Sequence, residues 1–251
     1  MNLFNPILAA ENLKNTVLKG EMRKYYRLAR GGRWYGGIST ADCLGCNLRC
    51  IFCWSGKPRD EAEKIGKFYS PEEVAEELIK CARKNNYHLL RLSGNEPTIG
   101  KIHLLKLLEI LSKEKYLFIL ETNGTLLDLD FIKDLKNFKK LHIRVSLKGT
   151  NGEEFSNLTG AKAETFDLIL ENLKNLANFN LRFNLAVMLS FSKEENILNL
   201  KENLKKISYK ILENFEEEYV FLYPIVVERL RKANIIPKVA YSPDGIPKKL
   251  I

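Results

Sequence analysis

The densest group of reactive side chains in this sequence is a run of cysteines. Cys46, Cys50 and Cys53 follow the spacing C-x3-C-x2-C, and Cys43 precedes them. Three thiolates can hold three corners of a [4Fe–4S] cube and leave the fourth iron open to bind a small molecule. A four-thiolate electron carrier has no such open iron. The triad therefore indicates a ligand-binding cluster, with Cys43 at the end of a strand beside it.

Other uses of the cysteines are open. With Cys43 the run reads C-x2-C-x3-C-x2-C, and four thiolates can hold structural zinc, although zinc sites usually pair two CxxC knuckles across a longer loop. A disulfide framework is disfavoured because five cysteines leave an odd thiol and no apolar signal segment opens the chain. We expect reduced cysteines, a cytoplasmic location and Cys81 on the inner face of a helix.

The composition suits one sizeable domain that must position this loop. The 251 residues are 45% hydrophobic, and no run approaches the ~18 apolar residues of a membrane span. Strand-like and helix-like segments alternate. Strands are predicted at residues 37–42, 88–93, 117–121, 141–147, 181–189 and 219–225. Helices are predicted from the Ser70-Pro71 capping signal onwards and near residues 101–113, 130–137, 162–177 and 194–207.

This alternation predicts parallel strands joined by right-handed crossovers. Six units are too few for the eight of a closed barrel, so the expected fold class is α/β, a partial (β/α)6 TIM-like barrel with a parallel sheet. In such folds the loops at the carboxyl ends of the strands build the active site. The cysteines occupy the first of these loops.

The cysteine spacing, with Phe52 directly before the last cysteine, resembles the signature of the radical S-adenosylmethionine (SAM) enzymes. The resemblance implies one [4Fe–4S] cluster on the three cysteines, with SAM bound to its open iron. It implies an oxidoreductase-like reaction in which SAM is split into methionine and a 5′-deoxyadenosyl radical. A low-potential donor, such as a ferredoxin or a flavodoxin-like protein, would supply the electron. Phe52 and Trp54 are expected to shield the cluster and pack near the adenine.

Two later loops carry further parts of the resemblance. Gly94-Asn95-Glu96-Pro97 resembles the family's G-G-E-P motif, which implies backbone contacts to the amino end of SAM. Asn95 replaces the second glycine, and asparagine tolerates positive φ better than most residues. An ordinary turn also suits this segment. Asn123 follows the third strand and is expected at the same mouth, although Asn-Gly also favours a plain turn.

Ser146 and Lys148 end the fourth predicted strand. They resemble the Asp-x-Lys segment of glycyl-radical-enzyme activases, the branch of pyruvate formate-lyase activating enzyme, with Ser146 in place of the aspartate. The resemblance implies that Lys148 offers a cation to the methionine carboxylate or to a ribose hydroxyl of SAM. A solvated surface lysine is the alternative.

Positive charge is concentrated at the two ends of the chain. Residues 1–37 hold seven Lys and Arg against two Glu, and residues 226–251 hold six against two acids, so they contribute +5 and +4 of the net +9. We divide the chain into a basic N-terminal extension (1–36), a radical SAM core (37–225) and a basic, proline-containing C-terminal extension (226–251) expected to be irregular. The first flank is expected to be an amphipathic helix with Tyr25 and Leu28 inward, although its basic and aromatic residues can also bind RNA.

Three functions are therefore compatible with the sequence. The favoured one is an activase-like enzyme that abstracts hydrogen from a substrate, a partner protein or a small molecule. The second is a radical SAM enzyme that modifies tRNA, favoured by the basic flanks and by Trp54 after Cys53. The third is a non-catalytic module that binds zinc or an iron–sulfur cluster.

Overall fold

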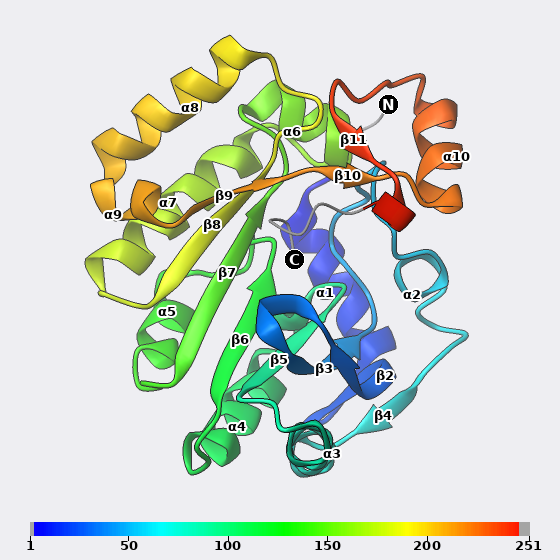
Figure 1. Ribbon diagram of the computed structural model, residues 1–251, viewed down its shortest axis with the longest axis vertical. Helices are drawn as coiled ribbons and strands as arrows, with labels where there is room; N and C mark the ends of the chain where they lie inside the picture. The colour runs from blue at the N-terminus through cyan, green and yellow to red at the C-terminus, as the bar shows by residue number, and fades with distance from the viewer. Residues whose placement is uncertain (1–2, 246–251) are drawn as a thin grey trace.

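The computed structural model describes residues 3–245, which fold around one curved sheet (Figure 1). Six strands pair in parallel in chain order: β3 (Ile38–Cys43), β5 (Leu89–Gly94), β6 (Leu117–Thr122), β7 (Leu141–Leu147), β8 (Phe183–Met188) and β9 (Phe215–Glu218). Among the described residues the strand order ends at β9, so the sheet does not close on itself. The predicted partial barrel of six parallel strands is confirmed.

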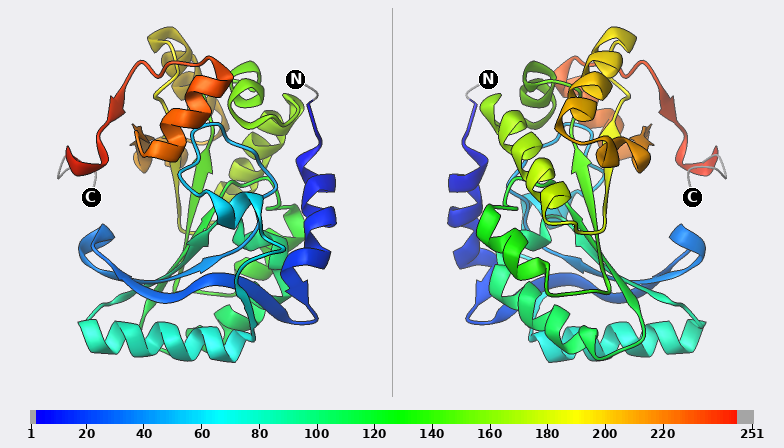
Figure 2. Two further views of the ribbon diagram at one scale, coloured as in Figure 1. Left: turned by 90° about the vertical axis from the view of Figure 1, so that its right-hand side faces the viewer. Right: turned by 90° about the vertical axis from the view of Figure 1, so that its left-hand side faces the viewer.

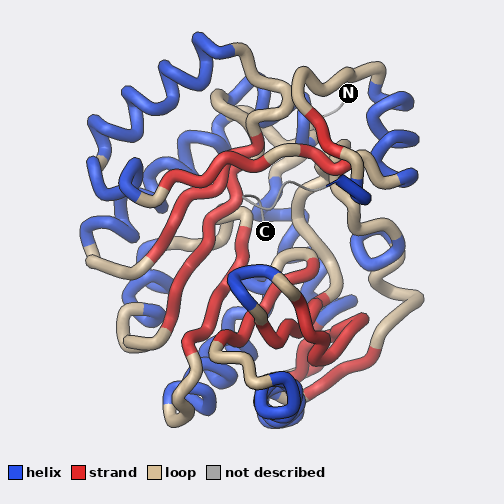
Figure 3. Tube along the Cα trace, viewed as in Figure 1, coloured by secondary structure: helices blue, strands red, loops and turns tan. Residues whose placement is uncertain are grey.

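Helices surround the outer side of the sheet (Figure 3). The five predicted crossover helices are present as α3 (Pro71–Asn85), α4 (Lys101–Ser112), α5 (Leu129–Leu135), α7 (Glu164–Asn178) and α8 (Glu194–Ile207). The other helices are α1 (Pro6–Val17), α2 (Lys57–Asp60), α6 (Gly152–Thr159), α9 (Tyr209–Glu213) and α10 (Pro224–Ala233), with short 3₁₀ turns η1 (Trp34–Gly36), η2 (Pro97–Gly100) and η3 (Pro243–Gly245). No helix among these described residues has the length and apolar character needed to cross a bilayer.

Helix α3 shows how local sequence sets these boundaries. The hydroxyl of Ser70 accepts from the Glu73 amide at 3.3 Å, and the Glu73 carboxylate accepts from the Ser70 amide at 2.7 Å. Pro71 begins the helix, where its missing N–H costs nothing. Asn86 ends it in the left-handed region at φ 54°. The predicted start of this helix is confirmed.

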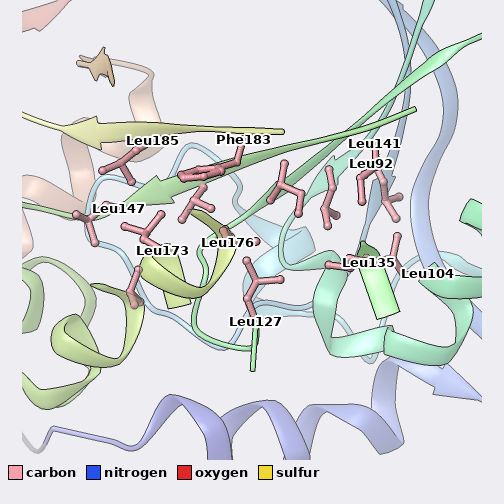
Figure 4. Packing of buried hydrophobic residues seen from close by; sticks show 14 of the residues in the cluster. Leu92, Leu104, Leu127, Leu135, Leu141, Leu147, Leu173, Leu176, Phe183 and Leu185 are labelled. Atoms are coloured by element: carbon pink, nitrogen blue, oxygen red, sulfur yellow. The ribbon is translucent and has the colours of Figure 1, made fainter. Parts of the chain in front are cut away.

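The main core lies between the sheet and the outer helices (Figure 4). Successive residues of a strand point to opposite faces of the sheet. In β7, Leu141 and Leu147 point toward the helices, and the residues between them alternate between the two faces. Leu173 and Leu176 of α7 pack against this apolar side. Polar side chains of the strands lie on the opposite, concave face. The reactive groups of the sheet are therefore inside the open barrel.

The N-terminal flank differs from its prediction. Only α1 is helical, and it leads through β1 (Leu18–Lys19) into a long strand, β2 (Met22–Gly32), which pairs antiparallel with β3 and with β4 (Lys67–Tyr69). Tyr25 and Leu28 are therefore strand residues, and the prediction that they lie on an amphipathic helix is wrong. Pairing with the already buried β3 outweighs helix propensity here, because it satisfies the backbone and buries Tyr25 completely.

The sixth parallel strand is also displaced from its prediction. It runs over Phe215–Glu218 and not over 219–225, where Val220–Phe221 forms a separate two-stranded sheet as β10 with β11 (Ala240–Tyr241). The C-terminal flank, predicted to be irregular, contains α10, which starts at Pro224. Pro243 lies in η3, whereas Pro247 lies outside the described residues.

Candidate functional site

The cysteine loop leaves the carboxyl end of β3 at the mouth of the open barrel. The amide of Leu44 donates to the carbonyl of Lys24 at 3.0 Å, and the amide of Ile51 donates to that of Leu158 at 2.9 Å. These bonds tie the loop to β2 on one side and to the end of α6 on the other. The three predicted ligands therefore sit on a backbone that neighbouring elements hold in place.

The thiols of the loop are chemically suited to an iron–sulfur cluster. Burial raises the pKa of Cys46 well above its ordinary value, and negative charge on Cys50 and Cys53 adds to the rise. Burial raises the pKa of Cys50 to about 11, while the cation of Lys148 acts to lower it. A thiol must lose its proton before it binds iron, so cluster loading has to offset the raised pKa values of Cys46 and Cys50, and iron binding by the three cysteines stays a prediction. Three soft thiol ligands in one loop, with a lysine nearby, fit a negatively charged cluster.

Asn95 joins the two ends of the cysteine loop. Its Oδ1 accepts from the Gly45 amide at 3.1 Å, and its Nδ2 donates to the Ser55 hydroxyl at 3.0 Å. The positive φ of this segment is at Gly94 (φ 103°), where a Cβ would lie 2.7 Å from backbone atoms of Cys43. Glycine is required at position 94, whereas the asparagine at position 95 acts as a side-chain bridge across the loop.

The carboxylate of Glu96 points into the protein, where it is fully buried. It accepts from the amide and hydroxyl of Thr98 at 3.2 and 2.6 Å, from the Thr122 hydroxyl at 2.7 Å and from the Asn123 amide at 2.7 Å. The Glu96 amide donates to the carbonyl of Gly45 at 3.0 Å. Glu96 thereby couples the loops after β3, β5 and β6. Pro97 follows it as the buried first residue of η2, and contact of this segment's backbone with SAM stays a prediction.

Asn123 lies beneath the cysteine loop. Its Nδ2 donates to the Asn47 side chain at 2.8 Å and lies 4.0 Å from the sulfur of Cys46. Its Oδ1 accepts from the Thr125 hydroxyl at 2.6 Å, and Asn47 in turn donates to the Pro6 carbonyl at 3.1 Å. The predicted meeting of Asn123 with the cysteine loop is therefore present. Sequence reasoning missed Asn47, whose position between two cysteines was the available signal.

Lys148 projects from the end of β7 toward the cysteine loop. Its ammonium lies 5.9 Å from the centre of the Phe52 ring and 3.6 Å from the Glu218 carboxylate, and it also donates to the Ser146 hydroxyl. The Ser146 hydroxyl donates to Glu218 at 2.6 Å. The lysine is held by groups at the barrel mouth, so the solvated-lysine alternative does not describe it.

The remaining predicted residues divide into buried and exposed ones. Phe52 is buried and packs against Phe191, with ring centres 5.6 Å apart. Trp54 is 49% exposed, and its packing near the adenine of SAM stays a prediction. Cys43 is fully buried at the end of β3, next to the loop as predicted. Cys81 is half-buried on α3, where the Nδ2 of Asn85 lies 3.7 Å from its sulfur.

A row of charged side chains crosses the concave face. Arg91 on β5 donates to Glu121 on β6 at 3.1 Å. Arg144 on β7 donates to Glu216 on β9 at 3.0 Å and to Glu218 at 2.8 Å. The sequence signal for this row is clearest in β7, where polar residues alternate with apolar ones and predict one polar face, whereas β9 lacks this alternation.

Glu218 provides a test of this row. Burial acts to raise its pKa, but Arg144, Lys148 and Ser146 hold the pKa at about 2. Against an unfolded value of about 4.3, this depressed pKa gives about 3 kcal/mol of stability that is present above pH ~4.3 and lost as the pH falls toward about 2. We expect the cluster-free Glu218→Gln chain to lack this contribution, so that its deficit in unfolding free energy shrinks below pH ~4.3.

Urea unfolding across this pH range measures the effect, with Glu213→Gln at the exposed end of α9 as the matched control. The control deficit should not depend on pH. A Glu218→Gln deficit that stays constant down to pH ~2 would show that the three neighbours do not stabilise the ionised carboxylate.

Comparison with known proteins agrees with this geometry. Residues 43–204 match the radical SAM superfamily. The chain belongs to this superfamily. The matched region runs from the end of β3 into the last turn of α8, so it contains the cysteine loop and the mouth built around it. As a radical SAM enzyme, the protein uses a [4Fe–4S] cluster and SAM.

Named relatives catalyse different reactions on this common core. GTP 3′,8-cyclase of Campylobacter jejuni (strain RM1221) is 28% identical over 201 residues, covering 76% of this chain and 59% of that enzyme. The cysteine-type anaerobic sulfatase-maturating enzyme of Clostridium perfringens (strain ATCC 13124) is 24% identical over 180 residues, covering 67% of this chain and 48% of that enzyme. The chain thus spans about half to three fifths of these relatives' lengths.

A solved structure shows the same fold. TYW1 with a lysine–pyruvate adduct bound superposes with a TM-score of 0.53 at 19% identity, covering 78% of this chain and 72% of that one. The superfamily prediction is confirmed. The resemblance to the activase branch stays a prediction, because the relatives named above are a cyclase and a maturation enzyme.

Proposed function

We propose that Cys46, Cys50 and Cys53 hold the cluster and that SAM binds at the mouth formed by the loops after β5, β6 and β7. The observation that carries this proposal is the convergence of Asn95, Asn123 and Lys148 on the cysteine loop from these three loops. When held by these three cysteines, a cluster would supply the electron that cleaves SAM into methionine and a 5′-deoxyadenosyl radical, and this radical would abstract hydrogen from the substrate.

The chain's own residues orient SAM and exclude water. Lys148 offers a cation to the methionine carboxylate or a ribose hydroxyl, and its neighbours Ser146 and Glu218 hold it at the mouth. Phe52 is buried against Phe191, and we propose that it shields the radical from unintended hydrogen donors. A ferredoxin or flavodoxin-like protein is the expected electron donor.

We favour a residue of a polypeptide as the source of the abstracted hydrogen. Within the described residues the sheet ends at β9, and we propose that a segment of the substrate polypeptide reaches the concave face from that edge. The arginines and glutamates on this face pair with one another, and a polypeptide substrate would bind there by exchanging some of these pairs for bonds to its backbone. The relative from Clostridium perfringens, named as a sulfatase-maturating enzyme, supports a protein substrate.

The alternative RNA substrate is less well supported by the N-terminal flank. Arg23 is buried and donates to the Leu44 carbonyl at 2.5 Å, and Lys24 donates to the Ala62 carbonyl at 2.7 Å. Arg27 and Arg30 both pair with the buried carboxylate of Asp42, at 2.9 and 2.6 Å. These four cations are engaged within the protein, so we expect weak RNA binding with little salt dependence.

Deuterium transfer tests the class of substrate. Extract of cells grown in deuterated medium is separated into protein, RNA and small-molecule fractions, and each is added to the reconstituted, reduced enzyme with unlabelled SAM. We expect deuterium in 5′-deoxyadenosine with the protein fraction alone. Label from RNA supports the tRNA alternative, and label from small molecules supports a reaction like that of a nucleotide cyclase. A loaded, reducible enzyme that never cleaves SAM contradicts the proposal.

Lys148→Ala tests the proposed SAM contact. A hydrogen bond to a charged group contributes about 1.5–3 kcal/mol, so we expect SAM affinity to fall roughly tenfold to hundredfold. Iron content should not change, because Lys148 is not a ligand. Equilibrium SAM binding to the loaded protein measures this, with Lys174→Ala on the exposed side of α7 as the control. Equal SAM affinities of the two variants would show that Lys148 does not contact SAM.

A further inference from the structure

Each of the three candidate ligand cysteines has its backbone carbonyl bound by a different arginine. An Nη1 atom donates in every case, and the donor–acceptor distance is 2.5 to 2.8 Å. The pairs are Arg49 with Cys46, Arg59 with Cys50, and Arg229 with Cys53. We call these three guanidinium groups the arginine collar.

Two members of the collar are joined into one network. Asp60 accepts from Arg59 Nε at 2.6 Å and also accepts from Arg229 Nη2. Arg229 donates in addition to the carbonyl of Ser55 at 3.2 Å. The side chains of Arg59 and Arg229 are only 10% and 13% exposed, so both cations are held in an environment with little water.

Arg229 reaches the loop from a distant part of the chain. It lies on α10, drawn in orange over the cyan cysteine loop in Figure 2, and is 176 residues from Cys53. Helix α10 lies beyond the matched superfamily region, which ends at residue 204. The segment after the common core therefore supplies a cation to the candidate cluster loop.

We propose that the arginine collar tunes the electron affinity of the cluster and slows its loss, with Arg229 as a positioning and tuning residue. This inference rests on the assignment of the cluster to Cys46, Cys50 and Cys53. A cluster on three thiolates gains negative charge when it is reduced, and fixed cations near it stabilise the reduced form. Guanidinium is suited to this role because it stays protonated and its planar fork binds two acceptors at once.

Two substitutions at Arg229 separate its charge from its hydrogen-bond geometry. Arg229→Gln keeps a donor and loses the charge, so at a fixed potential the ratio of reduced to oxidised cluster should fall about tenfold, equivalent to about 59 mV for one electron. Arg229→Lys keeps the charge and loses the fork, so the potential should hold while iron release to a chelator becomes several-fold faster. Arg231→Gln, two residues along α10 and exposed, is the matched control and should change neither.

Asp60→Asn gives an independent test with the opposite sign. Removing the negative charge between Arg59 and Arg229 should raise the reduced fraction at a fixed potential by several-fold. A spectroscopic redox titration of the complete, reconstituted protein measures all four variants after iron and sulfide have been quantified. Two results would overturn the proposed role of the arginine collar. One is an equal midpoint reduction potential in Arg229→Gln and Arg231→Gln, and the other is a shift of the potential in Asp60→Asn in the same direction as in Arg229→Gln. A wild-type protein that binds no cluster would instead overturn the proposed function.

Discussion

Replacing Cys46, Cys50 or Cys53 by alanine is expected to leave the protein almost without iron after reconstitution, whereas Cys43→Ala should retain about four irons per chain. The three residues share one loop, which hydrogen bonds to β2 and α6 hold in place. Cys43 lies fully buried at the end of β3, paired with Gly94. Iron and sulfide analysis together with the visible absorption spectrum measures the difference.

Cys81→Ala on α3 is the second control, because this thiol lies outside the cysteine loop. It should also load fully. Loss of iron in Cys43→Ala with an intact fold would indicate four thiolate ligands and no open iron for SAM. Stoichiometric zinc without sulfide in the wild type would favour the structural zinc alternative, and about eight irons per chain would require a second cluster.

Glu96→Ala should be the most destabilising substitution outside the hydrophobic core. It leaves four buried donors of Thr98, Thr122 and Asn123 without their acceptor. An unsatisfied buried donor costs about 1–3 kcal/mol, and because such costs overlap we expect a total loss of about 3–5 kcal/mol. Iron loading should fall as well, since Glu96 joins the cysteine loop to its two neighbours.

Chemical unfolding of the cluster-free chain gives the first effect, and iron content after reconstitution gives the second. Glu76→Ala, on the exposed side of α3, is the matched control and should stay within about 0.5 kcal/mol of the wild type. A Glu96→Ala protein as stable as this control would mean that water or rearrangement satisfies the four donors, and that the carboxylate does not hold the mouth together.

The parts of the fold that sequence could predict are those specified by nearby residues. The cysteine spacing, the capping pair of Ser70 and Glu73, and the apolar strand runs are local signals, and the first five parallel strands appear close to their predicted positions. Lys148 and Asn123 could be placed because each follows a strand whose carboxyl end faces the same mouth.

The missed features depend on partners far away in the chain. Three consecutive glutamates disfavour a strand, yet β9 forms because Arg144, 72 residues earlier, pairs with Glu216 across the sheet. The N-terminal cations resembled a nucleic-acid-binding surface because a sequence does not reveal that Asp42 and backbone carbonyls bind them. The contact between Arg229 and the cysteine loop has no local signal of any kind.

The long separation between Cys53 and Arg229 also has a consequence for biosynthesis. Ribosomes add about 5–20 residues per second, so the advance of 176 residues from Cys53 to Arg229 takes roughly 9–35 s to translate. The cysteines leave the ribosome long before α10 exists, and β6, β7 and α6 also follow them in the chain. During this interval the thiols are nascent and open to oxidation or to capture of other metals. Maturation is therefore best served when iron and sulfide arrive after α10 has been translated and has docked on the cysteine loop.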